Sequence, residues 1–377
     1  MPSRLPLMTM RTMRAGGALA AIAIFLPLRG RCDTYFRRHP WRWVRTAHKW
    51  WTVHSFALRL ELACCLLPAP LEATNSFRGG GKIIDSILSA GPNTYQKKAS
   101  NLEQIVSLID CVADLLPFVR RNSKAVAVVD LGAGKALLTR TVYEALERRV
   151  AVIALDCRRE TQRDRFYDPP PAECGAAAYT RVVGDVADLA QIKLPLPSAA
   201  HGGVIALAKH LCGGATDASL HALCEQPLAA FVGACCIAPC CHQKARADEY
   251  CNPSYLAAAG FGADPRVRTR RGVPSANEFK TLQMLVQISK AAHAADFAKY
   301  EKSNFLRVLG FRWCHRLGRL ARRLLEEGRL RHLRAAGFDA HLVRYCDAAV
   351  TPDNLAIIAT RRREQSDDEE AQCAPCR

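Results

Sequence analysis

The chain has 377 residues, of which 49% are apolar and 23% are charged. This composition excludes a largely disordered chain and indicates one large or two modest folded domains. The formal charge of +18 at neutral pH points to a polyanionic partner, either nucleic acid or an anionic membrane.

The positive charge is concentrated at the two ends of the chain. Residues 1–60 contribute +10 and residues 301–363 contribute +8, whereas residues 364–377 form an acidic tail of −4. Residues 61–300 carry only +4. This distribution is typical of an enzyme core flanked by surfaces that bind a polyanion.

The N-terminus is rich in arginine and has no acidic residue before Asp33. Its apolar run, 15–28, contains two glycines and a proline and is shorter than the roughly 20 apolar residues that span a bilayer. We therefore expect no transmembrane anchor and no stable membrane association. A mitochondrial presequence, a secretory signal and a poorly ordered extension all fit the composition, but cysteines crowded at 235–241 favour a reducing compartment. The expected location is cytoplasmic or nuclear, or mitochondrial if the N-terminus is a presequence.

Aromatic and histidine residues are dense between residues 32 and 65. Basic residues interleaved with tryptophan suit stacking on RNA, and Cys32 with His39, His48 and His54 offers zinc ligands. The spacing of these ligands matches no regular zinc finger. Proline and glycine then mark 67–81 as a linker.

From residue 94 onward, helical periodicity alternates with short apolar runs that end in polar or glycine-containing loops. Such runs are typical of buried parallel strands, and their alternation with helices predicts a doubly wound α/β sheet. The expected strands are 125–131, 151–156, 179–185, 203–209, 228–238, 340–346 and 354–360, and the expected helices are 94–121, 137–149, 214–224 and 312–335.

The strand at 125–131 runs into Asp130, Gly132 and Gly134 in the order Asp-x-Gly-x-Gly, and a helix follows. Glycines at such a turn let the backbone approach a nucleotide closely. The third glycine of the dinucleotide fingerprint is replaced by Ala136, and the acid precedes the glycines. This order suits S-adenosylmethionine, which has no pyrophosphate, better than NAD. The alternative is an ordinary glycine turn.

Acidic residues also end the next two strands. Asp156 lies twenty-six residues after Asp130, where an acceptor for ribose hydroxyls would lie, and Asp185 is placed to meet an adenine edge. Three acids at successive strand ends favour a cofactor crevice. The alternative for each is a solvated acid at the end of a strand.

Lys209, His210 and Asp217 follow the strand at 203–209 and are the candidate catalytic residues. A desolvated lysine has a lowered pKa and can take a hydroxyl proton, with the aspartate orienting or accepting. The alternative is a surface cation and an acidic residue in the first turn of a helix.

Cys240, Cys241 and His242 follow the strand at 228–238. Thiolates and imidazole are zinc ligands, but a Cys-Cys-His succession cannot easily surround one ion, and buried cysteine behaves as a small apolar residue. We therefore expect these residues to shape a substrate pocket in preference to binding zinc.

Together these segments resemble the tRNA:m(4)X modification enzymes. The resemblance covers about residues 94–361 and rests on the strings Asp130-Leu-Gly-Ala-Gly-Lys, Lys209-His-Leu-Cys-Gly-Gly-Ala-Thr-Asp217, Cys240-Cys241-His242, Leu324-Leu-Glu-Glu-Gly-Arg-Leu and Gly337-Phe-Asp. It implies a Rossmann-like methyltransferase that uses S-adenosylmethionine to methylate the ribose 2′-hydroxyl of nucleotide 4 in the tRNA acceptor stem. We accordingly expect a basic N-terminal extension over 1–78, a methyltransferase domain over 79–363 and an acidic tail over 364–377.

The chain departs from this family at two places. The residues after His242 are Gln-Lys-Ala where the family has His-Arg-Cys, and Trp43 and Trp51 stand where its N-terminal zinc finger has cysteines. We therefore expect little or no zinc in a degenerate finger. Two alternatives stay open: a catalytically impaired RNA-binding protein of the same fold, and an enzyme of this fold that acts on a small molecule.

The expected helix 312–335 carries arginines at three- and four-residue steps, opposite a stripe of leucines. An A-form acceptor stem is contacted mainly at phosphates and 2′-hydroxyls, so we expect this arginine face to bind tRNA. The alternative is a solvated helix face. The four arginines are Arg312, Arg316, Arg319 and Arg323.

Overall fold

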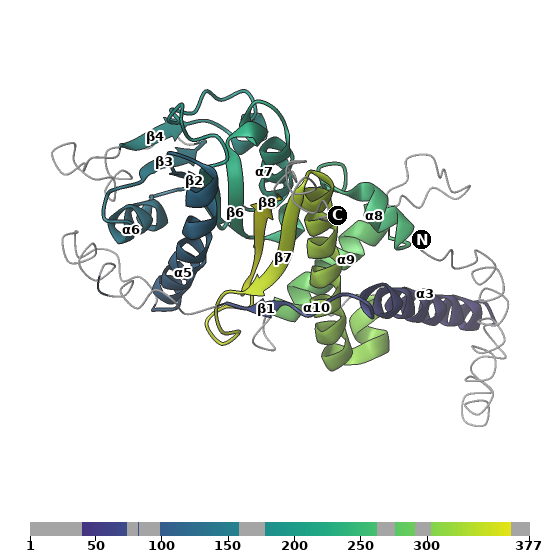
Figure 1. Cartoon of the computed structure of the whole chain (residues 1–377). Helices are drawn as coiled ribbons and strands as arrows, with labels where there is room; N and C mark the ends of the chain where they lie inside the picture. The colour runs from purple at the N-terminus through teal and green to yellow at the C-terminus, as the bar shows by residue number, and fades with distance from the viewer. Residues whose placement is uncertain are drawn as a thin grey trace, which may run out of the picture.

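The computed structural model describes residues 40–73, 82, 99–157, 178–261, 276–290 and 303–362. Its centre is an eight-stranded sheet in the order β1-β7-β8-β6-β5-β2-β3-β4 (Figure 1). The strands are β1 Leu71–Glu72, β2 Ala127–Leu131, β3 Ala151–Asp156, β4 Tyr179–Val183, β5 Val204–Lys209, β6 Val232–Ala238, β7 Phe338–Arg344 and β8 Leu355–Arg361.

The central strands are parallel, and the strand order reverses between β2 and β5. β2 pairs with β3 on one side and with β5 on the other, and β6 continues the parallel run. Only β8 runs against its neighbours β6 and β7. Ligands of doubly wound sheets bind beyond the carboxyl ends of the strands at such a reversal. The predicted α/β fold is confirmed, and it places the ends of β2, β3 and β5 at one edge of the sheet.

All seven expected strands are present, with shifts at their ends. The largest shift is at 228–238, where the first residues form a short 3-10 helix, Leu228–Ala230, and β6 begins only at Val232. β4 ends at Val183, so Asp185 lies in the loop beyond the strand.

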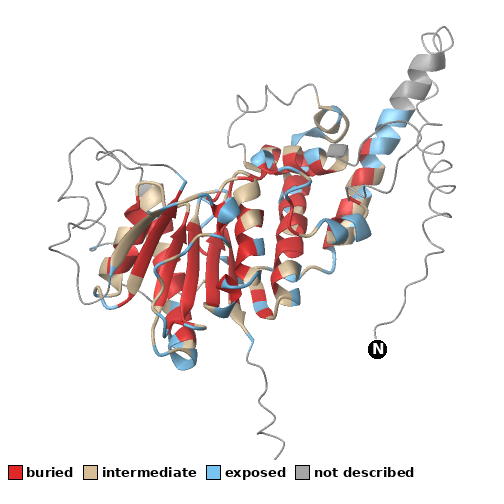
Figure 2. Cartoon of the chain, turned by 90° about the horizontal axis from the view of Figure 1, so that it is seen from above, coloured by how far each residue is buried: buried red, intermediate tan, exposed pale blue. Residues whose placement is uncertain are grey.

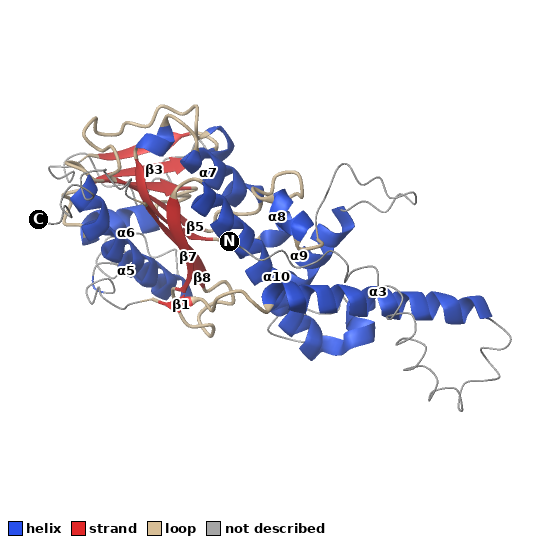
Figure 3. Ribbon diagram, turned by 45° about the vertical axis from the view of Figure 1, so that its right-hand side comes forward, coloured by secondary structure: helices blue, strands red, loops and turns tan. Residues whose placement is uncertain are grey.

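Helices cover both faces of the sheet (Figure 3). α5 Ala99–Asn122 and α6 Leu137–Ala145 pack on one face, where Leu108, Val119 and Val142 are buried. α7 Gly214–Cys224 and the C-terminal part of α10 Asn304–Ala335 pack on the other. The inner strands are therefore buried from both sides (Figure 2).

A third apolar core lies beyond the sheet edge and joins α3 Pro40–Cys64, α9 Ala276–Lys290 and the middle of α10. α3 buries Phe56, Leu60 and Cys64 there. A side chain at Gly318 would collide with the carbonyl oxygen of Leu285, so this glycine lets α10 lie directly against α9. A smaller helix, α8 Pro253–Ala258, packs on α10 nearby.

The region expected to be a finger remnant and a linker contributes to this fold. Residues 40–64 form one continuous helix, and β1 pairs in parallel with β7, with Leu71 opposite Val343. The linker expectation for 67–81 was therefore wrong at Leu71 and Glu72. The expected presequence and the acidic tail 364–377 lie outside the described residues, and the domain boundary near residue 78 stays a prediction. None of the described helices is long and apolar enough to cross a membrane.

Candidate active site

The turn after β2 lies against the end of β3. Gly132 and Gly134 have φ angles of 71° and 52°, a left-handed conformation that glycine adopts without strain. The Gly134 backbone N–H donates to a carboxylate oxygen of Asp156 at 2.9 Å, and Arg181 donates to the Gly134 carbonyl at 3.1 Å. No atom lies within 4 Å of where a Gly134 side chain would begin. The turn thus offers an open stretch of backbone beside a fixed carboxylate.

Asp130 lies beneath this turn and is buried. Its carboxylate accepts a hydrogen bond from the Thr139 hydroxyl at 2.6 Å. Burial raises the pKa of Asp130 to about 7, and the nearby Asp156 adds to the rise. Such a carboxyl changes charge near neutral pH, which is unusual outside functional sites.

Asp185 is exposed, and its carboxylate accepts from the Ala187 backbone N–H at 2.9 Å. It therefore caps the 3-10 helix Val186–Asp188. The predicted contact between Asp185 and a bound cofactor stays a prediction.

Lys209 ends β5 beside β2 and is half-buried. Its ammonium group donates to the side-chain oxygen of Asn101 on α5. Burial lowers the pKa of Lys209 to about 8, and the Asp130 carboxylate opposes that shift. We call Asp130 and Lys209 the crevice pair, because they come from neighbouring strand ends and affect each other's charge.

His210 follows Lys209 and is exposed, with a left-handed φ of 64°. This conformation is costly for a residue with a side chain, and strained residues of this kind cluster at active sites and ligand-binding loops. Partial burial and the Lys209 charge lower the pKa of His210.

Asp217, in contrast, is fully buried in the first turn of α7. Its two carboxylate oxygens accept from Arg329 of α10 at 3.0 and 2.6 Å. Asp217 also accepts from the Cys251 backbone N–H at 3.3 Å. The structure thus uses Asp217 to join α7 to α10, and its predicted role towards the acceptor hydroxyl stays a prediction.

The same arginine extends the contact to His242. Arg329 donates to Glu326 at 3.1 Å, and the Nε2 of His242 lies 2.6 Å from Glu326. Burial lowers the pKa of His242 to about 4. Burial also raises the pKa of Glu326, but the charges of Arg329 and Arg322 and the contact with His242 together lower it to about 2. A neutral imidazole therefore donates to a carboxylate. We call Asp217, Arg329, Glu326 and His242 the buried network.

Cys240 and Cys241 lie beside Cys212, a residue that the sequence did not single out as a site residue. The three sulfur atoms lie within 4.8 Å of one another and form the one such group of metal-ligand side chains in the part of the chain that is described. Cys235 and Cys236, which precede this group in the chain, are buried in β6 on opposite faces of the sheet.

The arginine face of α10 divides into two parts. Arg312, Arg316 and Arg319 are exposed, with Arg316 3.3 Å from Glu61 of α3 and beside the Trp313 ring. Arg323 instead donates to the carbonyls of Leu67 and Pro68. The predicted contact between these arginines and tRNA stays a prediction, and Arg323 has a structural partner.

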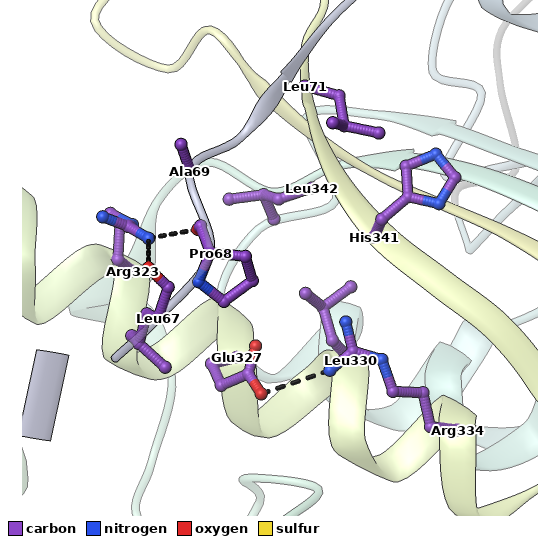
Figure 4. A pocket seen from close by; sticks show the side chains of 10 residues that line it. All are labelled: Leu67, Pro68, Ala69, Leu71, Arg323, Glu327, Leu330, Arg334, His341 and Leu342. Atoms are coloured by element: carbon purple, nitrogen blue, oxygen red, sulfur yellow. Dashed lines mark hydrogen bonds and ion pairs between the residues drawn. The ribbon is translucent and has the colours of Figure 1, made fainter. Parts of the chain in front are cut away.

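A cavity of about 120 Å³ lies at that contact, between residues 67–71, α10 and β7 (Figure 4). Arg323 and Arg334 line it, with Glu327 accepting from Arg334 at 3.2 Å. It contains none of the strand-end residues, so we do not assign the reaction to it.

Sequence reasoning missed Asn101, Cys212 and the α10 residues of the buried network. Asn101 lies in the expected helix 94–121, but nothing in its local sequence predicts contact with Lys209. Cys212 lies in the string Lys209–Asp217. Its contact with Cys240 depends on the pairing of β5 with β6, which the sequence did not reveal.

A family model described as Methyltransferase TRM13 matches residues 103–360. The tRNA:m(4)X modification enzyme TRM13 of Eremothecium gossypii is 31% identical over 63% of this chain and 57% of that protein. The enzyme of the same name from Kluyveromyces lactis is 26% identical over 64% and 58%. The chain thus spans somewhat over half the length of these relatives.

Among solved structures, the plantazolicin methyltransferase BpumL in complex with a desmethylPZN analogue and SAH is 13% identical, with coverage of 83% of this chain and 99% of that chain. The TM-score is 0.29, which is too low to support an argument about this chain.

Proposed function

The chain belongs to the TRM13 methyltransferase family, and we propose that it methylates the ribose 2′-hydroxyl of nucleotide 4 in the tRNA acceptor stem. The observation that carries this proposal is the crevice pair. The match over 103–360 contains both Asp130 and Lys209, and both titrate near neutral pH at adjoining strand ends.

S-adenosylmethionine would supply an electrophilic methyl group on a sulfonium. The residues of the glycine turn fit such a ligand. The open backbone at Gly134 allows close approach, and Asp156 is held by the turn itself as an acceptor for ribose hydroxyls. Asp130 supports this turn from below through its bond to Thr139.

Lys209 is the proposed base. A ribose hydroxyl is poorly acidic, and a lysine beside it has to be in the neutral amine form before it can take the proton. Burial favours the neutral amine of Lys209, and Asn101 fixes the direction of its nitrogen. His210 follows Lys209 directly and is exposed, so it can contact the acceptor.

The buried network has a positioning role in this proposal. Asp217 and Arg329 hold the first turn of α7, which begins five residues after Lys209. His242 anchors the loop after β6 to α10 through Glu326. Cys240 and Cys241 thereby keep their place beside the crevice.

The exposed arginines of α10 supply the proposed tRNA surface. Phosphate contacts need cations that reach solvent, and Arg312, Arg316 and Arg319 meet this condition. Phe311 and Trp313 on the same helix are 42% and 50% exposed and can pack on ribose or an unpaired base.

The test uses purified full-length protein, labelled S-adenosylmethionine and unmodified tRNA transcripts. We expect incorporation into a transcript with ribose at nucleotide 4 and none into a matched transcript with a 2′-deoxynucleotide there. A transcript with the 2′-deoxynucleotide at position 5 is the control and keeps its incorporation. Binding of every transcript without any incorporation would instead support an impaired RNA-binding protein.

A further inference from the structure

Three cysteine sulfur atoms meet where β5 and β6 end. Cys212 follows β5 by three residues, and Cys240 and Cys241 follow β6 by two and three residues. β5 and β6 are parallel neighbours, so their carboxyl ends lie side by side. The sulfurs of Cys212 and Cys240 are 3.5 Å apart, and all three sulfurs lie within 4.8 Å of one another.

This spacing suits a thiophilic cation. Zinc–sulfur bonds of about 2.3 Å in a tetrahedral site place sulfurs about 3.8 Å apart, within the observed range. Small side-chain rotations would therefore bring all three sulfurs into one coordination shell. Cys240 is buried, whereas Cys212 and Cys241 are partly exposed, so the cluster is open to solvent on one side.

The two loops are held together without the cation. Gly213 has a φ of 63°, and a side chain there would run into the backbone of Lys244. The loop that carries Cys212 thus lies directly on the short 3-10 helix His242–Lys244, next to Cys241. A ligand set fixed in this way loses little conformational entropy when it binds an ion.

His242 is not counted among the ligands, although it follows Cys241. Its Nε2 is 2.6 Å from Glu326, and its side chain belongs to the buried network. Other buried cysteines, such as Cys235 and Cys251, are outside the group of three.

We propose that Cys212, Cys240 and Cys241 bind one zinc ion, with a water molecule at the fourth position. The ion ties the loop after β5 to the loop after β6, beside Lys209. The protons that the thiols carry pass to solvent when the ion binds. This site is independent of the methyl-transfer proposal, because displacement at a sulfonium requires no metal.

The first experiment measures zinc by mass spectrometry in full-length protein purified under reducing conditions, and absorption after exchange for cobalt. Cysteines and histidines elsewhere also bind metals, so the variants decide the location. We expect Cys212→Ser and Cys241→Ser each to remove one equivalent of zinc or weaken its binding more than about tenfold, since each deletes one of three thiolates. Cys224→Ser, a partly buried cysteine outside the cluster, is the matched control and keeps the metal.

A second measurement needs no variant. Bound zinc should protect Cys212 and Cys241 of the wild-type protein from alkylation, and a chelator should remove that protection, as peptide mass spectrometry would report. Equal zinc content in wild type and both variants, absence of the cobalt–thiolate absorption, or alkylation that ignores the chelator would each overturn the site.

Discussion

The crevice pair and the buried network are both made of titratable side chains, yet the pKa values of the two sets are shifted in different ways. Asp130 and Lys209 have pKa values moved towards neutrality and lie at the carboxyl ends of neighbouring strands. In the buried network, Arg329 lowers the pKa of Glu326, and His242 stays neutral because burial lowers its pKa.

This difference separates a residue proposed to react from a residue that holds the fold, although both lie in the string Lys209–Asp217. Lys209 and Asp217 are eight residues apart and were both expected to act on the acceptor. A group that changes its charge near pH 7 can exchange protons. Asp217 is instead buried and accepts two hydrogen bonds from Arg329, which join α7 to α10. The comparison predicts distinct consequences for their variants.

Replacement of Lys209 by methionine should give the largest effect on the reaction. We expect kcat to fall by about two to four orders of magnitude, since general-base catalysis contributes that much, while the free energy of unfolding changes little. Single-turnover methyl transfer and urea unfolding measure the two quantities. Lys244→Met, an exposed lysine on the neighbouring loop, is the control; a similar loss of rate in both variants would contradict a special role for Lys209.

Replacement of Asp217 by alanine should affect stability most. Arg329 would keep its buried charge and lose a bidentate partner, so the free energy of unfolding should fall by about 3–5 kcal/mol. Urea unfolding at pH 7 checks this value, with Asp248→Ala, which breaks an exposed pair with Arg246, as the control that changes little. Asp217→Ala protein as stable as wild type would show that the network does not hold α7 to α10.

The pH dependence of kcat/KM should reveal the crevice pair. The neutral amine is the active form, so the rate should rise about tenfold per pH unit below 8 and level off above the lysine pKa of about 8. Asp130 titrates near pH 7, and Asp130→Asn should remove that ionisation and move the lysine inflection below pH 8, because the Asp130 carboxylate raises the lysine pKa. A flat profile from pH 6 to 9 in wild type would exclude both assignments.

The smallest expected effect lies at the proposed tRNA surface of α10. The double variant Arg316→Glu and Arg319→Glu should weaken tRNA binding roughly tenfold. It should also reduce the slope of log Kd against log salt by the amount expected for the loss of about two phosphate contacts. Arg120→Glu with Arg121→Glu changes the net charge equally on α5 and serves as the control. Unchanged binding by the α10 variant at low and high salt would leave this face merely solvated.

Most of the sheet could be predicted from the sequence because buried parallel strands are short apolar runs with clear ends. α3 was missed, since its tryptophans and histidines suggested a finger remnant. Val53, Phe56, Leu60 and Cys64 recur at three- and four-residue steps and all are buried, so helical periodicity was the available signal.

The sequence predicted the site residues that lie at strand ends, but not the partners that come from distant parts of the chain. Acids and a lysine at strand ends meet because parallel strands share an edge, which the sequence pattern contains. The partner of Asp217 lies 112 residues away, and the pairing of Arg329 with it depends on how α10 crosses α7. The same holds for Asn101, 108 residues from Lys209.

The most direct test of the account is single-turnover methyl transfer to an unmodified tRNA transcript by wild type, Lys209→Met and Lys244→Met at one temperature where all three are folded. The account predicts methyl transfer by wild type and by Lys244→Met. In Lys209→Met the rate of transfer should fall by at least about a hundredfold, while S-adenosylmethionine still binds. Transfer by Lys209→Met at the wild-type rate would contradict it.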